Sequence, residues 1–116
     1  WTGDDPALKA AMRRVRVVRA EHGDYLRRLA SRSVDIVYFD PMFRTPVEDS
    51  RAMRVLRETA ANTDPVRPEA VREAVRVARR CVVLKERPSS GEFERLGFTR
   101  LPAARGTTTV YGVIRI

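Results

Sequence analysis

Apolar residues recur along the chain with the three-to-four-residue spacing that is typical of amphipathic helices. The spacing is clearest at residues 68–78, where a proline near the start suits the first turn of a helix. An aspartate followed by proline at residues 5 and 6 is typical of a helix start as well. The pattern predicts helices over residues 6–14, 24–30, 48–61, 68–78 and 89–96, and Gly97 is expected to close the last of them.

Short apolar or β-branched runs separate these helices and predict strands. Residues 34–39 form a run that ends at Asp40-Pro41, which is typical of a central strand buried on both faces of a parallel sheet. Other strands are expected at residues 15–19 and 81–86, and a closing hairpin at residues 98–101 and 107–116. The order predicts an α/β domain, with right-handed crossovers onto mostly parallel strands flanked by helices and a C-terminal antiparallel β-hairpin.

The chain has 116 residues, of which 43% are hydrophobic, so a single domain is expected. No apolar stretch approaches the length of a membrane span, and no signal-peptide pattern is present, which favours a cytoplasmic protein. The single cysteine, Cys81, opens an apolar run and is expected in the core. The single histidine, His22, is expected in a loop, and no pattern indicates a metal site.

The net charge is +8, and every basic residue except Lys9 and Lys85 is an arginine. Arginine binds phosphate through two parallel hydrogen bonds, so the composition favours a nucleic-acid partner. The alternative is that many of these arginines only solvate the outer faces of helices.

The segment Val34-Asp-Ile-Val-Tyr-Phe-Asp-Pro-Met-Phe43, with Val82-Val-Leu-Lys85 and Arg87-Pro88, resembles a known family. It is similar to the C-terminal half of Rossmann-like S-adenosylmethionine-dependent methyltransferases. The greatest similarity is to the small-subunit (16S) rRNA guanine-N2 methyltransferases and their uncharacterised bacterial relatives. The resemblance implies S-adenosyl-L-methionine as cofactor, RNA as partner, and methylation of an exocyclic amino group, with guanine N2 in rRNA as the first choice.

The residue types around Asp40 suit this chemistry. An exocyclic amine is a weak nucleophile, because its lone pair is delocalised into the ring, and it needs acceptors that orient it toward the methyl group. Asp40 is the expected acceptor, Pro41 would fix the turn, and Phe43 could stack on a base turned out of its helix. The alternative is that Asp-Pro merely ends a strand and Phe43 is a core residue.

The resemblance also implies roles for residues outside this turn. Asp24 follows the expected third strand, where an acidic residue commonly meets the adenine of the donor, with Tyr25 as its neighbour. The alternative for Asp24 is a helix N-cap without a ligand. The expected substrate-binding residues are Met42 and Arg44 of the loop and Lys85 and Arg87, for which a solvated strand end is the alternative.

Two parts of the family pattern are missing, the glycine-rich turn after the first strand and the acidic residue after the second. Residues 1–116 are therefore expected to be the C-terminal portion of a methyltransferase domain lacking the first two strands, and this portion alone could be inactive. Without those strands the strand at residues 34–39 would be an edge, which predicts a homodimer through that edge or association with the missing N-terminal half.

Other functions remain open at this point. A sister reaction is methylation of adenine N6 or of DNA, and a small-molecule methyltransferase is a further choice. A nucleic-acid-binding or dimerisation module without activity is the alternative from a different class.

Overall fold

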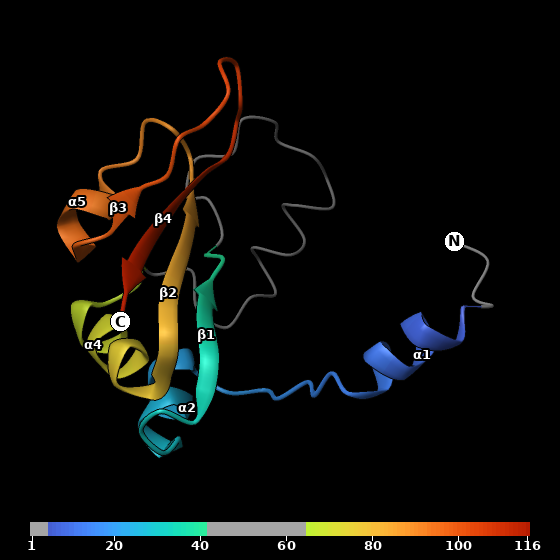
Figure 1. The fold of residues 1–116 in the computed structure, drawn as a ribbon. Helices are drawn as coiled ribbons and strands as arrows, with labels where there is room; N and C mark the ends of the chain where they lie inside the picture. The colour runs from blue at the N-terminus through green and yellow to red at the C-terminus, as the bar shows by residue number, and fades with distance from the viewer. Residues whose placement is uncertain (1–4, 42–64) are drawn as a thin grey trace.

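The computed structural model describes residues 5–41 and 65–116 (Figure 1). Most of the predicted elements are present within these ranges, while the helix expected at residues 48–61 lies outside the described residues. The elements in chain order are α1 (Pro6–Arg13), α2 (His22–Arg28), β1 (Val34–Phe39), α4 (Pro68–Val77), β2 (Ala78–Glu86), α5 (Glu92–Leu96), β3 (Thr99–Arg100) and β4 (Val110–Arg115).

The described strands form one four-stranded sheet in the order β1-β2-β4-β3. β1 and β2 are parallel, whereas β4 is antiparallel to both β2 and β3. Three of these four strands therefore point in one direction, although only one of the three pairings is parallel. The structure confirms a mixed α/β domain that ends in an antiparallel hairpin, and it corrects the prediction of mostly parallel pairing, because the last strand lies between β2 and β3.

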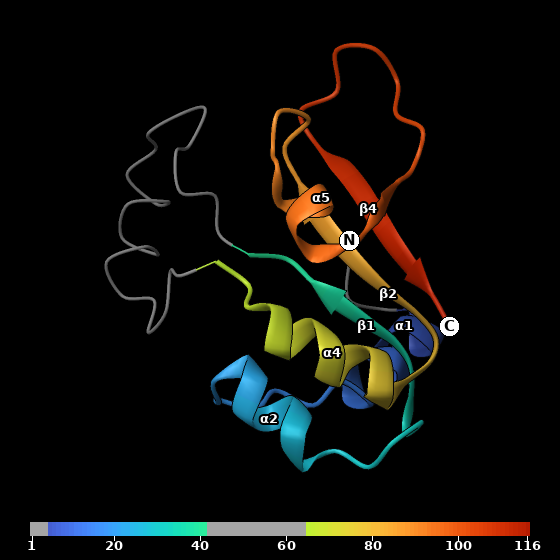
Figure 2. The ribbon, with the colours of Figure 1, turned by 90° about the vertical axis from the view of Figure 1, so that its left-hand side faces the viewer.

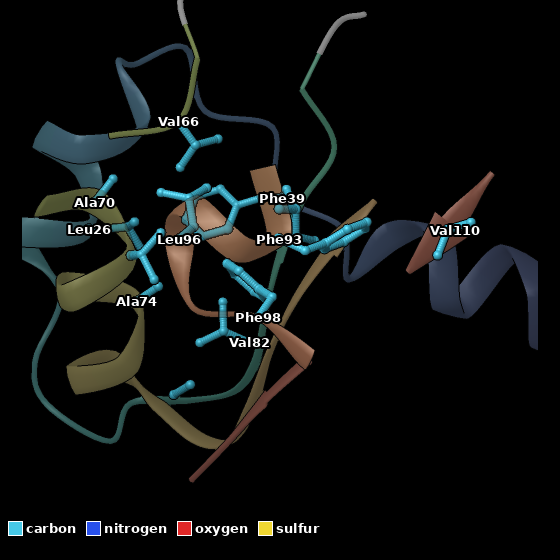
Figure 3. Close-up of a cluster of buried hydrophobic side chains, with 13 residues drawn as sticks. Leu26, Phe39, Val66, Ala70, Ala74, Val82, Phe93, Leu96, Phe98 and Val110 are labelled. Carbon is cyan, nitrogen blue, oxygen red and sulfur yellow. The ribbon is translucent and has the colours of Figure 1, made fainter. Parts of the chain in front are cut away.

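Helices α2, α4 and α5 lie together on one face of the sheet (Figure 2). The apolar core lies between these helices and the sheet, and Figure 3 shows its side chains converging from both layers. Within the described residues, no helix is both long and apolar enough to span a membrane. Buried core side chains include Leu26 of α2, Ala74 of α4, Phe93 of α5 and Val82 and Leu84 of β2.

The opposite face of the sheet is more exposed, and we call it the open sheet face. Side chains alternate along a strand, so this face carries Ile36 and Tyr38 of β1, Cys81, Val83 and Lys85 of β2, and Tyr111, Val113 and Arg115 of β4. Of these, Val113 is buried. Ile36 and Tyr38 are 52% and 50% exposed. The prediction that β1 is buried on both faces is therefore wrong, and Cys81 is half-buried on this face.

β1 is also the first strand in the sheet order, and within residues 5–41 and 65–116 no strand pairs with its outer edge. The predicted edge position of this strand is confirmed for the described residues, while its cause, two missing strands of the resembled family, stays a prediction.

Residues 15–19 contain no strand, which corrects a second prediction. Val15, Val17 and Val18 are 68%, 94% and 53% exposed in an extended connection between α1 and α2. β-branched alternation suits a strand, but a strand forms only where a neighbouring strand accepts its hydrogen bonds. The described part of the chain places no such neighbour beside this connection.

Several helix ends follow the predicted local signals. The Asp5 side chain accepts a hydrogen bond from the N–H of Ala7 at 2.9 Å, and Pro6 occupies the first turn of α1. Pro68 starts α4 in the same way. Gly97 ends α5 with a φ of 82°, a left-handed conformation that glycine adopts without strain.

Helix α4 runs into β2 without a loop, since Val77 ends the helix and Ala78 begins the strand. The carbonyl groups at this junction accept bonds from the segment before β1. The N–H of Arg32 donates to the Arg76 carbonyl at 3.1 Å, and the N–H of Ser33 donates to the Val77 carbonyl at 3.0 Å. The Arg32 guanidinium also donates to the Ala78 carbonyl at 2.7 Å. These bonds satisfy the last turn of the helix and hold it against the start of β1.

Candidate functional site

Asp40 and Pro41 follow β1 directly, at the carboxyl end of the strand. Phe39 is paired with Leu84 in the parallel ladder, so the next residue of each strand, Asp40 and Lys85, come side by side. The Asp40 Oδ1 atom lies 3.5 Å from Lys85 Nζ, and the two side chains are 50% and 29% exposed. The structure thus brings together two residues that the sequence assigned separately to acceptor and phosphate-binding roles.

Two tyrosines that the sequence did not single out lie beside this ion pair. Tyr38 precedes Asp40 by two residues and shares its side of the strand, while Tyr111 is paired with Lys85 across β2 and β4. Partial desolvation raises the pKa of Tyr38, and the negative charge of Asp40 adds to this increase. The Tyr38 phenol therefore stays protonated at neutral pH and can donate a hydrogen bond.

The strand alternation was a usable signal for Tyr38, because it places this residue on the same side as Asp40. Tyr111 had no such signal, because its place opposite Lys85 depends on the register between β2 and β4. Together Asp40, Lys85, Tyr38 and Tyr111 form a polar and aromatic cluster at one end of the open sheet face, which we call the Asp40 cluster.

Asp24 lies within α2 and is not the residue that caps this helix. Glu21 is the N-cap, and its carboxylate accepts from the N–H groups of Gly23 at 3.0 Å and Asp24 at 2.8 Å. These backbone hydrogen bonds lower the pKa of Glu21. The Asp24 carboxylate forms an ion pair with Arg27 one turn later. The N-cap interpretation of Asp24 is therefore wrong, and its side chain faces solvent.

A pocket of about 360 Å³ lies between the start of α2 and the segment that leads into α4. Its lining carries carboxylates and guanidinium groups, including Glu21, Asp24, Arg27, Arg67 and Glu69. Carboxylates of this kind can accept hydrogen bonds from amino or hydroxyl groups of a ligand, while guanidinium groups donate to its anionic groups. Tyr25, which was predicted beside Asp24, does not line the pocket and is 36% exposed.

His22 connects this pocket to the end of β1. It is the first residue of α2 and not a loop residue, as the sequence had suggested. Its ring meets the ring of Phe39 edge to face, with centroids 5.9 Å apart and planes at 79°. Because Phe39 is the last residue of β1 and Asp40 follows it, the pocket and the Asp40 cluster adjoin the same end of this strand.

Of the remaining predicted site residues, the structure describes only Arg87. Arg87 follows β2 and is half-buried, so its guanidinium is less open to solvent than a surface arginine. Met42, Phe43 and Arg44 lie outside the described residues, and their substrate roles remain predictions. Among residues 5–41 and 65–116, no group of three His, Cys, Asp or Glu side chains could hold a metal ion.

Comparison with known proteins gives one similarity. The chain is 41% identical over 116 residues to the uncharacterized protein YpiP of Bacillus subtilis (strain 168). The match takes in 99% of the chain but 44% of YpiP, so the chain spans less than half the length of this relative. No protein-family model and no solved structure matches the chain.

Proposed function

We propose that this chain is the substrate-side part of an S-adenosylmethionine-dependent methyltransferase that acts on an exocyclic amino group of a nucleic-acid base, with guanine N2 of rRNA as the leading target. The observation that carries the proposal is the position of Asp40-Pro41. The carboxylate is half exposed, directly follows β1 and lies beside Lys85 at the carboxyl end of a parallel strand pair. Open α/β sheets bind their ligands outside this end of their strands.

The Asp40 cluster has the groups that such a transfer needs. The exposed Asp40 carboxylate can accept an N–H of the amine and so direct its lone pair toward the methyl group. Lys85 holds the carboxylate from the neighbouring strand, which restricts its orientation. Tyr38 and Tyr111 add donors and flat apolar surfaces of the kind on which unstacked bases lie.

The sheet supports the same proposal at a coarser level. Three described strands run in one direction, and the last strand returns antiparallel between two of them. A largely unidirectional sheet that finishes in a hairpin is the arrangement on which the resemblance to Rossmann-like methyltransferases rests. A net charge of +8 that comes almost entirely from arginine agrees with RNA as the substrate, because arginine favours polyanions.

The pocket beside α2 suits the hydrogen-bonding groups of the methyl donor. Its carboxylates, Asp24 among them, fit the amino and hydroxyl groups of S-adenosylmethionine, and its guanidinium groups fit the carboxylate. The donor, when bound, supplies an electrophilic methyl group. Asp24 would then hold the donor, while Asp40 holds the amine at the neighbouring end of β1.

The test is transfer of radiolabelled methyl from S-adenosylmethionine to unmethylated small-subunit rRNA, with adenine-containing DNA and free nucleosides as other acceptors. The assay uses the 116-residue chain and, at the matching positions, full-length YpiP. We expect Asp40→Asn to reduce the rate about 100-fold through loss of orientation. Asp35→Asn is the matched control, because Asp35 is an exposed acidic residue of the same strand that pairs with Arg79 at 3.2 Å.

Full methyl transfer by Asp40→Asn would contradict the role of Asp40. If neither wild-type protein transfers methyl to any of the acceptors, the proposal that the chain is part of a methyltransferase is contradicted. The high positive charge would then favour the second candidate, a module that binds nucleic acid without modifying it. That module predicts RNA binding that weakens steeply with salt and is unchanged by S-adenosylmethionine.

A further inference from the structure

The open sheet face presents neighbouring apolar side chains that are partly exposed. Ile36 and Tyr38 of β1 are about half exposed, Tyr111 of β4 is 41% exposed, and Cys81 and Val83 lie between them in β2. These side chains are contiguous, because Ile36 is paired with Cys81 and Tyr38 with Val83. Contiguous apolar patches on a protein surface mark interaction sites.

A second apolar region is exposed in the same way. α1 (Pro6–Arg13) contains no buried residue. Its apolar side chains Leu8 and Met12 lie one turn apart on the same side of the helix and are 38% and 52% exposed. The connection that follows exposes Val17 almost completely. Two separate parts of the described chain therefore present apolar side chains that find no partner within it.

We propose that the open sheet face is the docking surface for a further segment of polypeptide, of the kind that YpiP carries outside the matched region. The chain spans 44% of YpiP, so this relative has more than enough additional chain to cover one face of a four-stranded sheet. The docked segment lays apolar side chains on Ile36 and Val83, leaves the rings of Tyr38 and Tyr111 to the Asp40 cluster, and can add hydrogen bonds to the outer edge of β1.

The observations disfavour two other occupants. A second copy of the chain would bring two molecules of net charge +8 together, and their repulsion opposes self-association. Lys85 and Arg115 lie at the two ends of this face. Nucleic acid is nevertheless a poor match for its centre, because Ile36 and Val83 offer no hydrogen-bond donor to a phosphate or a base edge. The proposal does not depend on the function proposed above, although a docked segment would also form a wall beside the Asp40 cluster.

The test compares the reactivity of a single thiol in two proteins. Ile36→Cys is made in a Cys81→Ser form of the 116-residue chain, and the matching substitution is made in cysteine-free, full-length YpiP. Modification by N-ethylmaleimide is followed by mass spectrometry. We expect the thiol to react readily in the chain and at least about tenfold more slowly in YpiP, where it would react only during local opening of the docked segment.

Arg72→Cys is the matched control, because the Arg72 side chain of α4 is 70% exposed on the helical side of the molecule. It should react equally fast in both proteins. Val83→Cys, in the strand next to Ile36, is a second probe of the open sheet face, and it keeps the test valid if Ile36→Cys prevents folding.

Equal rates at the open-face thiols in the two proteins would overturn the proposal. Protection in the 116-residue chain that increases with its concentration would also overturn it, because a second copy would then be the occupant. Protection of YpiP that appears only after addition of RNA would do the same, since nucleic acid would cover the face.

Discussion

Replacement of Gly112 by alanine would place a methyl group where the ring of Phe93 already lies. A Cβ atom built at Gly112 would be 2.4 Å from Phe93 Cδ1, 2.6 Å from Cε1 and 3.0 Å from Phe98 Cβ. Carbon atoms prefer separations of about 3.5–4.0 Å, so the ring would have to move by about 1 Å or more. Phe93 is fully buried and Phe98 is 7% exposed, which leaves little room for such a shift.

Overpacking of a well-packed core destabilises a protein by about 1–3 kcal/mol, and we expect Gly112→Ala to fall in this range. For a domain of this size that corresponds to a decrease in melting temperature of roughly 4–12 °C. The free energy of unfolding is measured by urea denaturation followed by circular dichroism. Gly91→Ala is the control, because no atom lies within 4 Å of a Cβ at Gly91.

A double variant tests the mechanism directly. Phe93→Leu removes part of the ring that the new methyl group would meet, so Gly112→Ala should destabilise the Phe93→Leu protein less than the wild type. Strictly additive effects, or a Gly112→Ala protein within about 0.5 kcal/mol of the wild type, would refute the reasoning.

Three other variants test separate features. Gly97→Ala forces alanine into a left-handed conformation at the end of α5 and should reduce the free energy of unfolding by about 1–2 kcal/mol, measured in urea. Backbone hydrogen bonds lower the pKa of Glu21 below 4.5, so its contribution to stability is present above pH 4.5 and is lost as the pH falls through the folded-state pKa. Acid titration of the melting temperature should show this loss in the wild type and not in Glu21→Gln. Asp40→Asn should lower the raised pKa of Tyr38 toward its usual 10.0, seen by ultraviolet titration of tyrosine, and an unchanged titration would contradict their interaction.

The sequence predicted best those features that depend on neighbouring residues along the chain. Asp5 and Pro6 start α1, Pro68 starts α4, and Gly97 ends α5, because caps and fixed backbone angles act within one turn. The end of β1 just before Asp40-Pro41 was also predictable, since an apolar run ended by this dipeptide is a local pattern.

Features that depend on distant parts of the chain were not predictable in the same way. The valines at residues 15–18 have the side chains of a strand but no strand beside them in the described ranges. The exposure of Ile36 depends on what covers the second face of the sheet, which the strand's own composition does not reveal. Lys85 and Tyr111 meet only because the register between β2 and β4, two strands that are not consecutive in the chain, places them opposite each other.

The sequence indicated the wrong residue, Asp24, as the N-cap of α2, and the reason is local. Both Glu21 and Asp24 are acidic residues near the start of α2, and the shorter aspartate is the more common N-cap. The longer glutamate nevertheless reaches the N–H groups of residues 23 and 24, so the helix begins earlier than predicted.

The loopless junction between α4 and β2 has a consequence for the folding pathway. Its carbonyl groups are bonded by Arg32 and Ser33, and the bond from Arg32 to Ala78 joins residues 46 positions apart. The chain must therefore close a long loop before the parallel ladder of β1 and β2 can extend, and such non-local closure slows folding. We predict that this corner forms in the transition state, so that changes at Arg32 alter the folding rate, whereas changes in the β3–β4 hairpin alter mainly the unfolding rate, as chevron plots of the two kinds of variant would measure.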